Sequence, residues 1–205
     1  MIKRQDVKLV LASASPRRRE LLEQIGVQFR VQAADIDESV LPGESPGDYT
    51  LRVARDKALA VLNSAGSALP VLGADTAVIL DGRILGKPGS REEAATMLSL
   101  LSGRTHQVYS AVAVAVSQQD VQQRLNVSSV TFADLDTAWI ECYIDTGDPM
   151  DKAGAYGVQG LAAERISRID GSFSGVMGLP LYETSQLLEA LKCYSRTGSK
   201  SAIRA

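Results

Sequence analysis

Residues 11–22 read LASASPRRRELL, an apolar segment that ends in two serines and a proline before three consecutive arginines. Pro16 suits the first turn of a helix, and Ser15 before it is a preferred N-cap residue. Leu21 and Leu22 give this helix an apolar face. The segment before the serines is short and wholly apolar, which is typical of a buried strand. A strand that continues directly into a helix indicates an α/β protein.

The alternation of strand and helix patterns continues along the chain. Ser90 and Glu93 form a capping box, which marks the start of another helix. Because strands and helices alternate irregularly, without a repeat or a linker, the sequence predicts an α/β fold with a mixed, twisted sheet flanked by helices. The expected strands cover residues 8–12, 28–34, 69–80, 107–116 and 121–132, with hairpin turns at Asp81-Gly82 and Asp170-Gly171, and the expected helices cover residues 16–25, 46–61, 90–101, 137–144 and 180–192.

The composition is that of one sizeable globular domain. Of the 205 residues, 45% are hydrophobic and 22% are charged, so we expect residues 1–195 to form a single domain and residues 196–205 a disordered tail. The formal net charge of −2 disfavours a general nucleic-acid binder, which usually carries a basic excess. No apolar stretch is long enough to span a membrane, and the run at residues 9–12 is too short for a signal peptide, so we expect a cytoplasmic protein.

Two glycine-containing segments look like nucleotide-binding motifs but do not match them. In GRILGKP (residues 82–88) three residues separate the glycines where a P-loop has four, and Pro88 stands where a P-loop has Ser or Thr. GAYGVQG (residues 154–160) does not match G-x-G-x-x-G, and no strand-to-helix unit frames it. The sequence therefore predicts neither a P-loop ATPase nor a dinucleotide-binding protein. Cys142 and Cys193 have no metal-ligand spacing, and we expect both to be reduced thiols.

The three arginines allow two interpretations. Free N–H groups and the positive end of the dipole at a helix start favour a bound anion, and Ser13 and Ser15 add hydroxyl donors. Arg17 and Arg18, nearest the turn, can reach over such a ligand, whereas Arg19 points away around the helix. The alternative is a solvated basic helix face without a ligand, which is the commoner use of such a run.

Asp75 is the second unusual residue, because it stands inside the otherwise apolar strand LPVLGADTAVIL (residues 69–80). Burying a carboxylate costs several kcal/mol unless it is paired, metal-bound or exposed at a cleft. One interpretation is an acid neutralised by a neighbouring cation, and the other is a functional carboxylate at a cleft. Glu38, Lys57 and Lys87 are ordinary when taken alone, as a loop acid, a surface lysine and a lysine after a hairpin.

Seven segments of the chain, in this order, resemble motifs of the Maf family of nucleoside triphosphate pyrophosphatases: LASASPRRRELL, IDES, ARDKA, GADT, GKP, SGRTHQVYSAVAV and DKAGAYGVQG. The resemblance extends from about Leu9 to Leu188. The arginine after SP, the threonine after GAD and the glutamine in GVQG are similar to the branch that acts on dTTP and UTP. The resemblance implies an inosine triphosphatase-like fold with two lobes around a cleft, and hydrolysis of the triphosphate to monophosphate and pyrophosphate. It also implies a divalent metal, Mg²⁺ or Mn²⁺, and a homodimer.

The resemblance also implies roles for individual residues. Asp75 is expected to be the general base and, with Glu38, to bind the metal. Specificity for the nucleobase is expected from Arg17, Thr76 and Gln159. The phosphates are expected to bind Ser13, Arg18, Lys57 and Lys87.

The residue types suit this chemistry. A triphosphate carries roughly four negative charges near neutral pH, which arginine forks and lysine ammonium groups can neutralise. Carboxylates are oxygen ligands that Mg²⁺ prefers, and a carboxylate can accept a proton from an attacking water. The Gln159 amide can pair with the imide edge of uracil or thymine. For Thr76 and Gln159 alone, an ordinary strand residue and an ordinary loop residue are equally good interpretations.

Two further functions stay open. One is a non-catalytic regulator of septum formation that binds nucleotide or nucleic acid, against which the acidic net charge and Asp75 argue. The other is the same enzyme class acting on 7-methyl-GTP or on modified pyrimidine nucleotides, which altered residues at Arg17, Thr76 and Gln159 would have favoured.

Two aromatic features are expected to be structural. His106, the only histidine, stands where a strand begins, and such a residue is more often structural than catalytic. Trp139 and Tyr143 lie four residues apart on a predicted helix and are expected to pack against each other.

Overall fold

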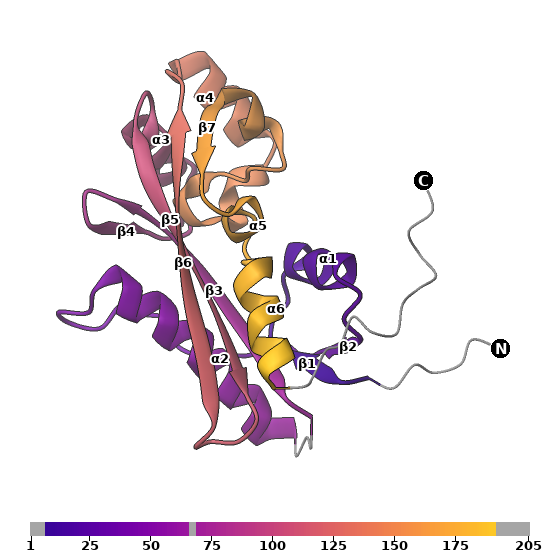
Figure 1. Ribbon diagram of the computed structural model, residues 1–205. Coiled ribbons are helices and arrows are strands. Elements are labelled where there is room, and N and C mark those ends of the chain that lie inside the picture. The colour runs from indigo at the N-terminus through magenta and orange to yellow at the C-terminus, as the bar shows by residue number, and fades with distance from the viewer. Residues whose placement is uncertain (1–6, 66–68, 192–205) are drawn as a thin grey trace, which may run out of the picture.

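A computed structural model describes residues 7–65 and 69–191, and its centre is a seven-stranded mixed sheet (Figure 1). The strand order is β2-β1-β3-β5-β6-β7, and β4 pairs with β3 beside this path. β1 pairs in parallel with β2 and β3, and all other pairings are antiparallel. The predicted α/β fold with a mixed sheet is therefore confirmed. The expected tail of residues 196–205 lies outside the described residues.

The strands are β1 (Leu9–Leu11), β2 (Phe29–Val31), β3 (Val71–Leu80), β4 (Arg83–Leu85), β5 (Thr105–Ala115), β6 (Val121–Phe132) and β7 (Ile166–Asp170). The α-helices are α1 (Pro16–Gln24), α2 (Pro46–Ala65), α3 (Arg91–Leu101), α4 (Thr137–Asp145), α5 (Phe173–Val176) and α6 (Leu181–Ala190). Three short 3₁₀ turns lie between α4 and β7, namely η1 (Asp148–Asp151), η2 (Ala153–Ala155) and η3 (Leu161–Arg165).

Local sequence signals explain where several elements begin and turn. The Ser15 hydroxyl accepts a hydrogen bond from the Arg18 backbone N–H and caps α1, as the opening segment predicted. Asp81 and Gly82 turn β3 into β4 with φ angles of 50° and 75°, the left-handed conformation that a tight hairpin requires.

The predicted hairpin at Asp170-Gly171 is wrong. Gly171 does turn the chain, with φ at 121°, but no strand follows. The Ser172 hydroxyl instead accepts a hydrogen bond from the Gly175 N–H and caps the short helix α5. The sequence signal of a glycine turn was correct, and the cap residue after it decided the next element.

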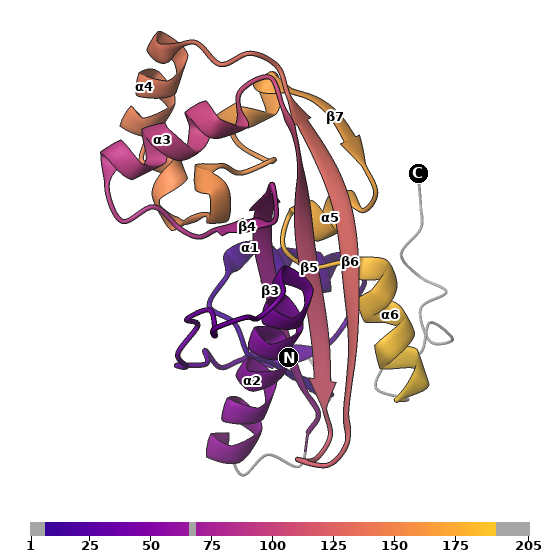
Figure 2. The same cartoon turned by 90° about the vertical axis from the view of Figure 1, so that its left-hand side faces the viewer.

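The helices divide the molecule into two lobes along the long strands. In Figure 2, α2 and α6 lie on opposite sides of the sheet, while α3 and α4 lie together at its other end. Two large hydrophobic clusters match this division. One contains Leu21, Leu72, Val112 and Leu187, beside α1 and α6; the other contains Leu98, Leu101, Phe132, Ile140 and Tyr143, around α3 and α4.

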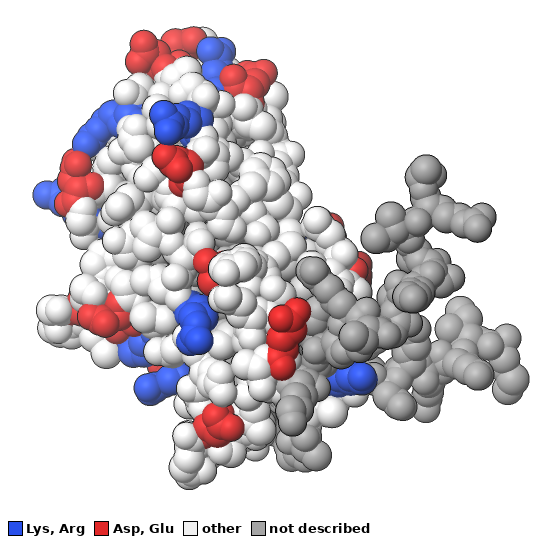
Figure 3. Space-filling view, viewed as in Figure 1, with Lys and Arg blue, Asp and Glu red and all other residues white. Residues whose placement is uncertain are grey.

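The distribution of charge on the surface and the composition of the helices are those expected from the sequence. On the face shown in Figure 3, Lys and Arg are interspersed with Asp and Glu. Among the described residues, no helix is both long enough and apolar enough to cross a membrane.

α2 lies very close to the sheet where it crosses β3 at Gly73. A Cβ added to Gly73 would lie 2.2 Å from the Ala54 carbonyl oxygen and 2.7 Å from the Ala58 nitrogen. Both atoms belong to helix backbone, so no side-chain movement could relieve the overlap. The missing side chain at Gly73 therefore sets how near α2 lies to the central strand.

We expect Gly73→Ala to lower the free energy of unfolding by about 1–3 kcal/mol, because the helix must shift away from the strand. Urea denaturation followed by circular dichroism measures this change. Gly86→Ala is the matched control, since a Cβ there meets no atom within 4 Å, and we expect it to stay within about 0.5 kcal/mol of the wild type. Equal stability of the two variants would contradict the argument.

Candidate active site

A cavity of about 640 Å³ lies between the two lobes. Its walls come from the start of α1, the loop after β2, α2, the middle of β3, the segment after β4, and residues 151–158. One part of the wall is charged. The other part is apolar and contains Val78, Leu85, Val108, Val158 and Met177.

Asp75, Lys57 and Glu38 form a charged chain in this cavity. Lys57 Nζ lies 2.9 Å from Asp75 Oδ1 and 2.9 Å from Glu38 Oε2. The side chains of Asp75 and Lys57 are 7% and 10% exposed, whereas that of Glu38 is 45% exposed. Asp75 is thus both neutralised by a cation and placed at a cavity.

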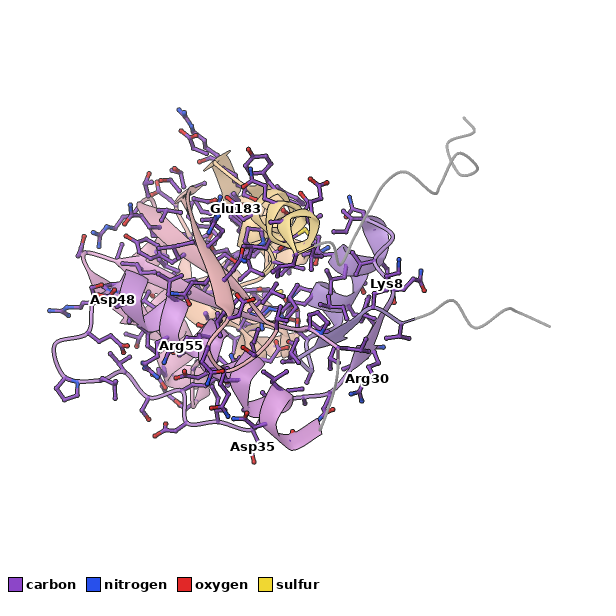
Figure 4. The ribbon with its side chains drawn as sticks, turned by 60° about the horizontal axis from the view of Figure 1, so that its bottom comes forward. Lys8, Arg30, Asp35, Asp48, Arg55 and Glu183 are labelled. Atoms are coloured by element: carbon purple, nitrogen blue, oxygen red, sulfur yellow. The ribbon has the colours of Figure 1, made fainter. Side chains whose placement is uncertain are left out.

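The pairing follows from how α2 lies on β3. Asp75 is two residues after Gly73 and so projects from the same face of the strand, against α2. Lys57 stands between Ala54 and Ala58, the residues whose backbone meets Gly73, and its side chain continues towards the carboxylate. Arg55, two residues earlier, is exposed and is labelled at the surface in Figure 4.

Arg18 is used mainly to hold the site together. Its guanidinium donates to the Gly178 carbonyl at 2.8 Å, to the Ser13 hydroxyl at 3.2 Å and to the Thr76 hydroxyl at 3.3 Å. The Thr76 hydroxyl also lies 3.3 Å from that of Ser110. Burial lowers the pKa of Arg18, which the negative charges of Asp75 and Glu38 partly offset. Ser13, Arg18 and Thr76 therefore form one connected group at the base of α1.

Arg17 and Lys87 are cations of the cavity wall whose charge no acidic side chain of the described residues pairs with. Both line it, and within residues 7–65 and 69–191 neither forms an ion pair. Burial raises the pKa of Asp151, but the hydrogen bond and charge of Lys152, together with the charge of Arg17, hold it below its usual value. Arg17 therefore faces the segment around Asp151 from the other lobe.

Among the described residues, Gln159 is the one predicted site residue that neither lines the cavity nor forms a hydrogen bond with a residue that lines it. Its neighbours Gly157 and Val158 line the cavity, while Gln159 itself is exposed. The structure brings seven predicted residues to the wall, and Ser13 lies behind it. The seven are Arg17, Arg18, Glu38, Lys57, Asp75, Thr76 and Lys87.

Tyr49 and Lys152 are among the polar wall residues for which no role was predicted from the sequence. Tyr49 lies on α2 and lines the cavity; burial and the negative charges of Asp75 and Glu38 raise its pKa to about 12. Its spacing of eight residues from Lys57, two helical turns, could have placed it on the same face. Lys152 also lines the cavity; it belongs to the segment DKAGAYGVQG, in which a role was predicted only for Gln159.

His106 is structural, as the sequence predicted. It is 2% exposed, its Nε2 lies 2.7 Å from the Tyr156 hydroxyl, and its ring stacks on Phe132. It does not line the cavity. Burial lowers its pKa to about 4, so the ring is neutral in the folded protein near neutral pH.

The carboxylates fit a hard divalent cation such as Mg²⁺. Asp75 Oδ1 and Glu38 Oε2 accept hydrogen bonds from Lys57 Nζ, which leaves the second oxygen of each carboxylate available to a metal ion. In the described part of the chain, no group of three or more His, Cys, Asp or Glu residues converges. This donor set matches an ion that binds through one or two carboxylates and completes its shell with substrate phosphates and water.

Comparisons with known proteins agree with the fold and the motifs. The family described as Maf-like protein matches residues 8–191. Similar proteins include a dTTP/UTP pyrophosphatase from Colwellia psychrerythraea, 52% identical over 185 residues, which cover 88% of this chain and 87% of that protein. Another is a dTTP/UTP pyrophosphatase from Methylobacillus flagellatus, 52% identical over 182 residues, or 88% and 91% of the two chains. Among solved structures, a HAM1 protein from Coxiella burnetii aligns with a TM-score of 0.50 at 18% identity and covers 90% of this chain and 100% of its own.

We expect Lys57→Met to lower the free energy of unfolding by about 3 kcal/mol, because it leaves the buried Asp75 carboxylate without a cation. Adding Asp75→Asn should restore at least half of this loss. Arg55→Met, an exposed site on the same helix, should change stability by less than about 0.5 kcal/mol. Urea denaturation of the four proteins tests the pairing, and a Lys57→Met variant as stable as wild type would disprove it.

We expect stability to fall as the pH drops from 6.5 to 4.5, in part because of His106. Its folded pKa of about 4 lies below the ordinary value of 6.5, so the unfolded chain binds more protons in this window. The contribution is present above pH 6.5 and decreases by about 2 kcal/mol on acidification to pH 4.5. His106→Gln should remove this part of the slope in denaturation experiments across the window. An unchanged slope would mean that His106 does not contribute.

Proposed function

The chain belongs to the Maf-like protein family, and from this premise we propose that it hydrolyses dTTP and UTP to the monophosphate and pyrophosphate. The observation that carries the proposal is the buried Asp75, held by Lys57 at the wall of a cavity large enough for a nucleotide. The resemblance noted in the sequence is confirmed by the family match over residues 8–191. Relatives about half identical to this chain are dTTP/UTP pyrophosphatases, which supports the choice of substrates.

The charged wall suits a triphosphate. The substrate carries roughly four negative charges, and Arg17 and Lys87 supply cations that no acid of the described chain neutralises. The start of α1 adds the positive end of the helix dipole beside Ser15. Phosphoryl transfer depends mainly on positioning and electrostatic stabilisation, and this wall supplies both.

Asp75 is the general base of the proposed reaction. Lys57 binds Asp75 Oδ1 and orients the carboxylate, so that Oδ2 accepts the proton of the water that attacks the α phosphorus. Pyrophosphate leaves towards the cationic wall. A Mg²⁺ or Mn²⁺ ion held by Asp75 and Glu38 would supply charge neutralisation on the phosphates.

The nucleobase end of the cavity is formed by apolar residues and by the segment that carries Gln159. Val108, Val158 and Met177 provide surface for a pyrimidine ring, and Thr76 lies beside them on β3. Gln159 follows Val158, which lines the cavity, and in the proposed complex its amide pairs with the imide edge of thymine or uracil. Arg17 approaches the same region from the other lobe.

The wider setting is also part of the proposal. We place the enzyme in the cytoplasm, where nucleoside triphosphates are made and used, and expect it to act as a homodimer without a nucleic-acid partner. Interspersed surface charges on the face in Figure 3 support the last point, because duplex binding usually requires a basic patch.

We expect Asp75→Asn to lower pyrophosphate release from dTTP and UTP by about 10³-fold, because the water loses its proton acceptor. The assay compares a panel of nucleoside triphosphates, including 7-methyl-GTP, with Mg²⁺ or Mn²⁺. Asp81→Asn is the matched control: Asp81 lies at the end of the same strand, in the turn after it, and does not line the cavity. We expect its activity within twofold of wild type.

Different outcomes separate the candidate functions. Full activity of Asp75→Asn would remove this residue from the mechanism. If the wild type hydrolyses none of the nucleotides, the cavity is an anion site without chemistry, and a regulator that binds nucleotide becomes the better account. Preference for 7-methyl-GTP would keep the reaction and change the substrate.

A further inference from the structure

The segment of residues 151–158 in the cavity wall is held by a polar network around the buried Lys152. Lys152 Nζ donates to the Asp148 carbonyl at 2.5 Å and lies 2.9 Å from Asp148 Oδ1 and 2.6 Å from Asp151 Oδ1. Asp148 and Asp151 neutralise its charge, and two of its three N–H donors are used by the Asp148 carbonyl and Asp151 Oδ1. Although Lys152 lines the cavity, its role is therefore to hold this segment rather than to bind a phosphate.

The segment with Gln159 packs directly on that ion pair. A Cβ added to Gly157 would lie 2.7 Å from Lys152 Cε, and one added to Gly160 would lie 2.8 Å from Asp148 Oδ2. The backbone on both sides of Gln159 thus lies close against the side chains of Lys152 and Asp148. Movement of the ion pair would move the segment.

Tyr143 of α4 joins the ion pair to the segment. Its hydroxyl donates to Asp148 Oδ2 at 2.7 Å and accepts a hydrogen bond from the Gly157 N–H at 3.2 Å. The residue is 0% exposed, and its ring stacks on Trp139 with centroids 5.1 Å apart, which fixes the direction of the hydroxyl.

The ionisation states agree with this arrangement. Burial raises the pKa of Tyr143, and its hydrogen bond to Asp148 raises it further, so the phenol keeps its proton. Burial also raises the pKa of Asp148, but hydrogen bonds from Lys152 and Tyr143 outweigh that effect and hold the pKa below its usual value. A neutral donor therefore meets a charged acceptor, which makes the hydrogen bond a strong one.

We propose that Tyr143 is a positioning residue for nucleobase recognition, which fixes the segment of Gly157 to Gly160 and thereby the place of Gln159. The inference rests on the proposed function. Tyr143 does not line the cavity and acts only through Asp148 and the Gly157 N–H. Catalytic residues on β3 and α2 lie outside this network, so selectivity for the base depends on Tyr143 while turnover does not.

The test compares kcat and KM for dTTP and dCTP, because cytosine presents an amino group and a ring acceptor where thymine presents the imide. Tyr143→Phe removes only the hydroxyl. We expect the ratio of kcat/KM for dTTP over dCTP to fall at least tenfold, through a higher KM for dTTP, with kcat changed less than threefold. A general loss of structure would lower activity on both nucleotides alike.

Two further variants sharpen the comparison. Trp139→Phe, on the same helix, loses the indole N–H that donates to Glu164 but keeps a ring against Tyr143, so the dTTP/dCTP ratio should stay within twofold of wild type. Combined with Gln159→Ala, Tyr143→Phe should lower the ratio no further than Gln159→Ala does alone, because both act on one contact.

The outcomes are distinct. An unchanged ratio in Tyr143→Phe, or full additivity with Gln159→Ala, overturns the inference and leaves the proposed function intact. A wild type that hydrolyses dTTP and dCTP equally well also overturns it, since no recognition of the base is then present. A wild type without turnover refutes the proposed function and this inference together.

Discussion

A carboxylate buried in a central strand requires a cation, and the way Lys57 reaches Asp75 governs the arrangement of the whole site. Gly73 allows the backbone of α2 to lie on β3. Because Asp75 projects from the same face two residues later, the helix can deliver Lys57 to it at 2.9 Å. The same Nζ draws Glu38 in from the loop after β2. One close helix-to-strand contact thus places both carboxylates and their counter-ion.

The cations of the cavity fall into two groups with different work. Acidic side chains neutralise Lys57 and Lys152, and the Arg18 guanidinium donates hydrogen bonds to Ser13, Thr76 and Gly178. Such groups build the wall, because breaking a buried pair costs several kcal/mol. Arg17 and Lys87 have no such partner in the described chain, so their charge remains for the substrate. A count of basic residues alone would not separate these roles.

The sequence predicted the fold because its features depend on local patterns, whereas Glu38, Lys57 and Lys87 were singled out only by the resemblance to the Maf family. Apolar runs, Ser15 as a cap and the Asp81-Gly82 turn act over a few residues. The hairpin at Asp170-Gly171 was wrong because Ser172 starts a helix where the glycine had only indicated a turn. The partners of Lys152 and Arg18 lie in contacts between distant segments, such as Arg18 with Gly178. No spacing rule contains those contacts, and the role of Arg18 as a brace could be found only in three dimensions.

The two lobes hold the buried Asp75 and the segment of Gln159 by separate polar networks. Asp75 and Lys57 belong to the contact of α2 with β3, whereas the segment of Gly157 to Gly160 is held by Asp148, Lys152 and Tyr143 in the other lobe. The two networks share no hydrogen bond among the described residues, although both face one cavity. Changes at distant, independent sites are usually additive, so in the proposed enzyme the segment of Gly157 to Gly160 can change without disturbing Asp75. A fold built in this way can keep one reaction and vary the nucleotide on which it acts.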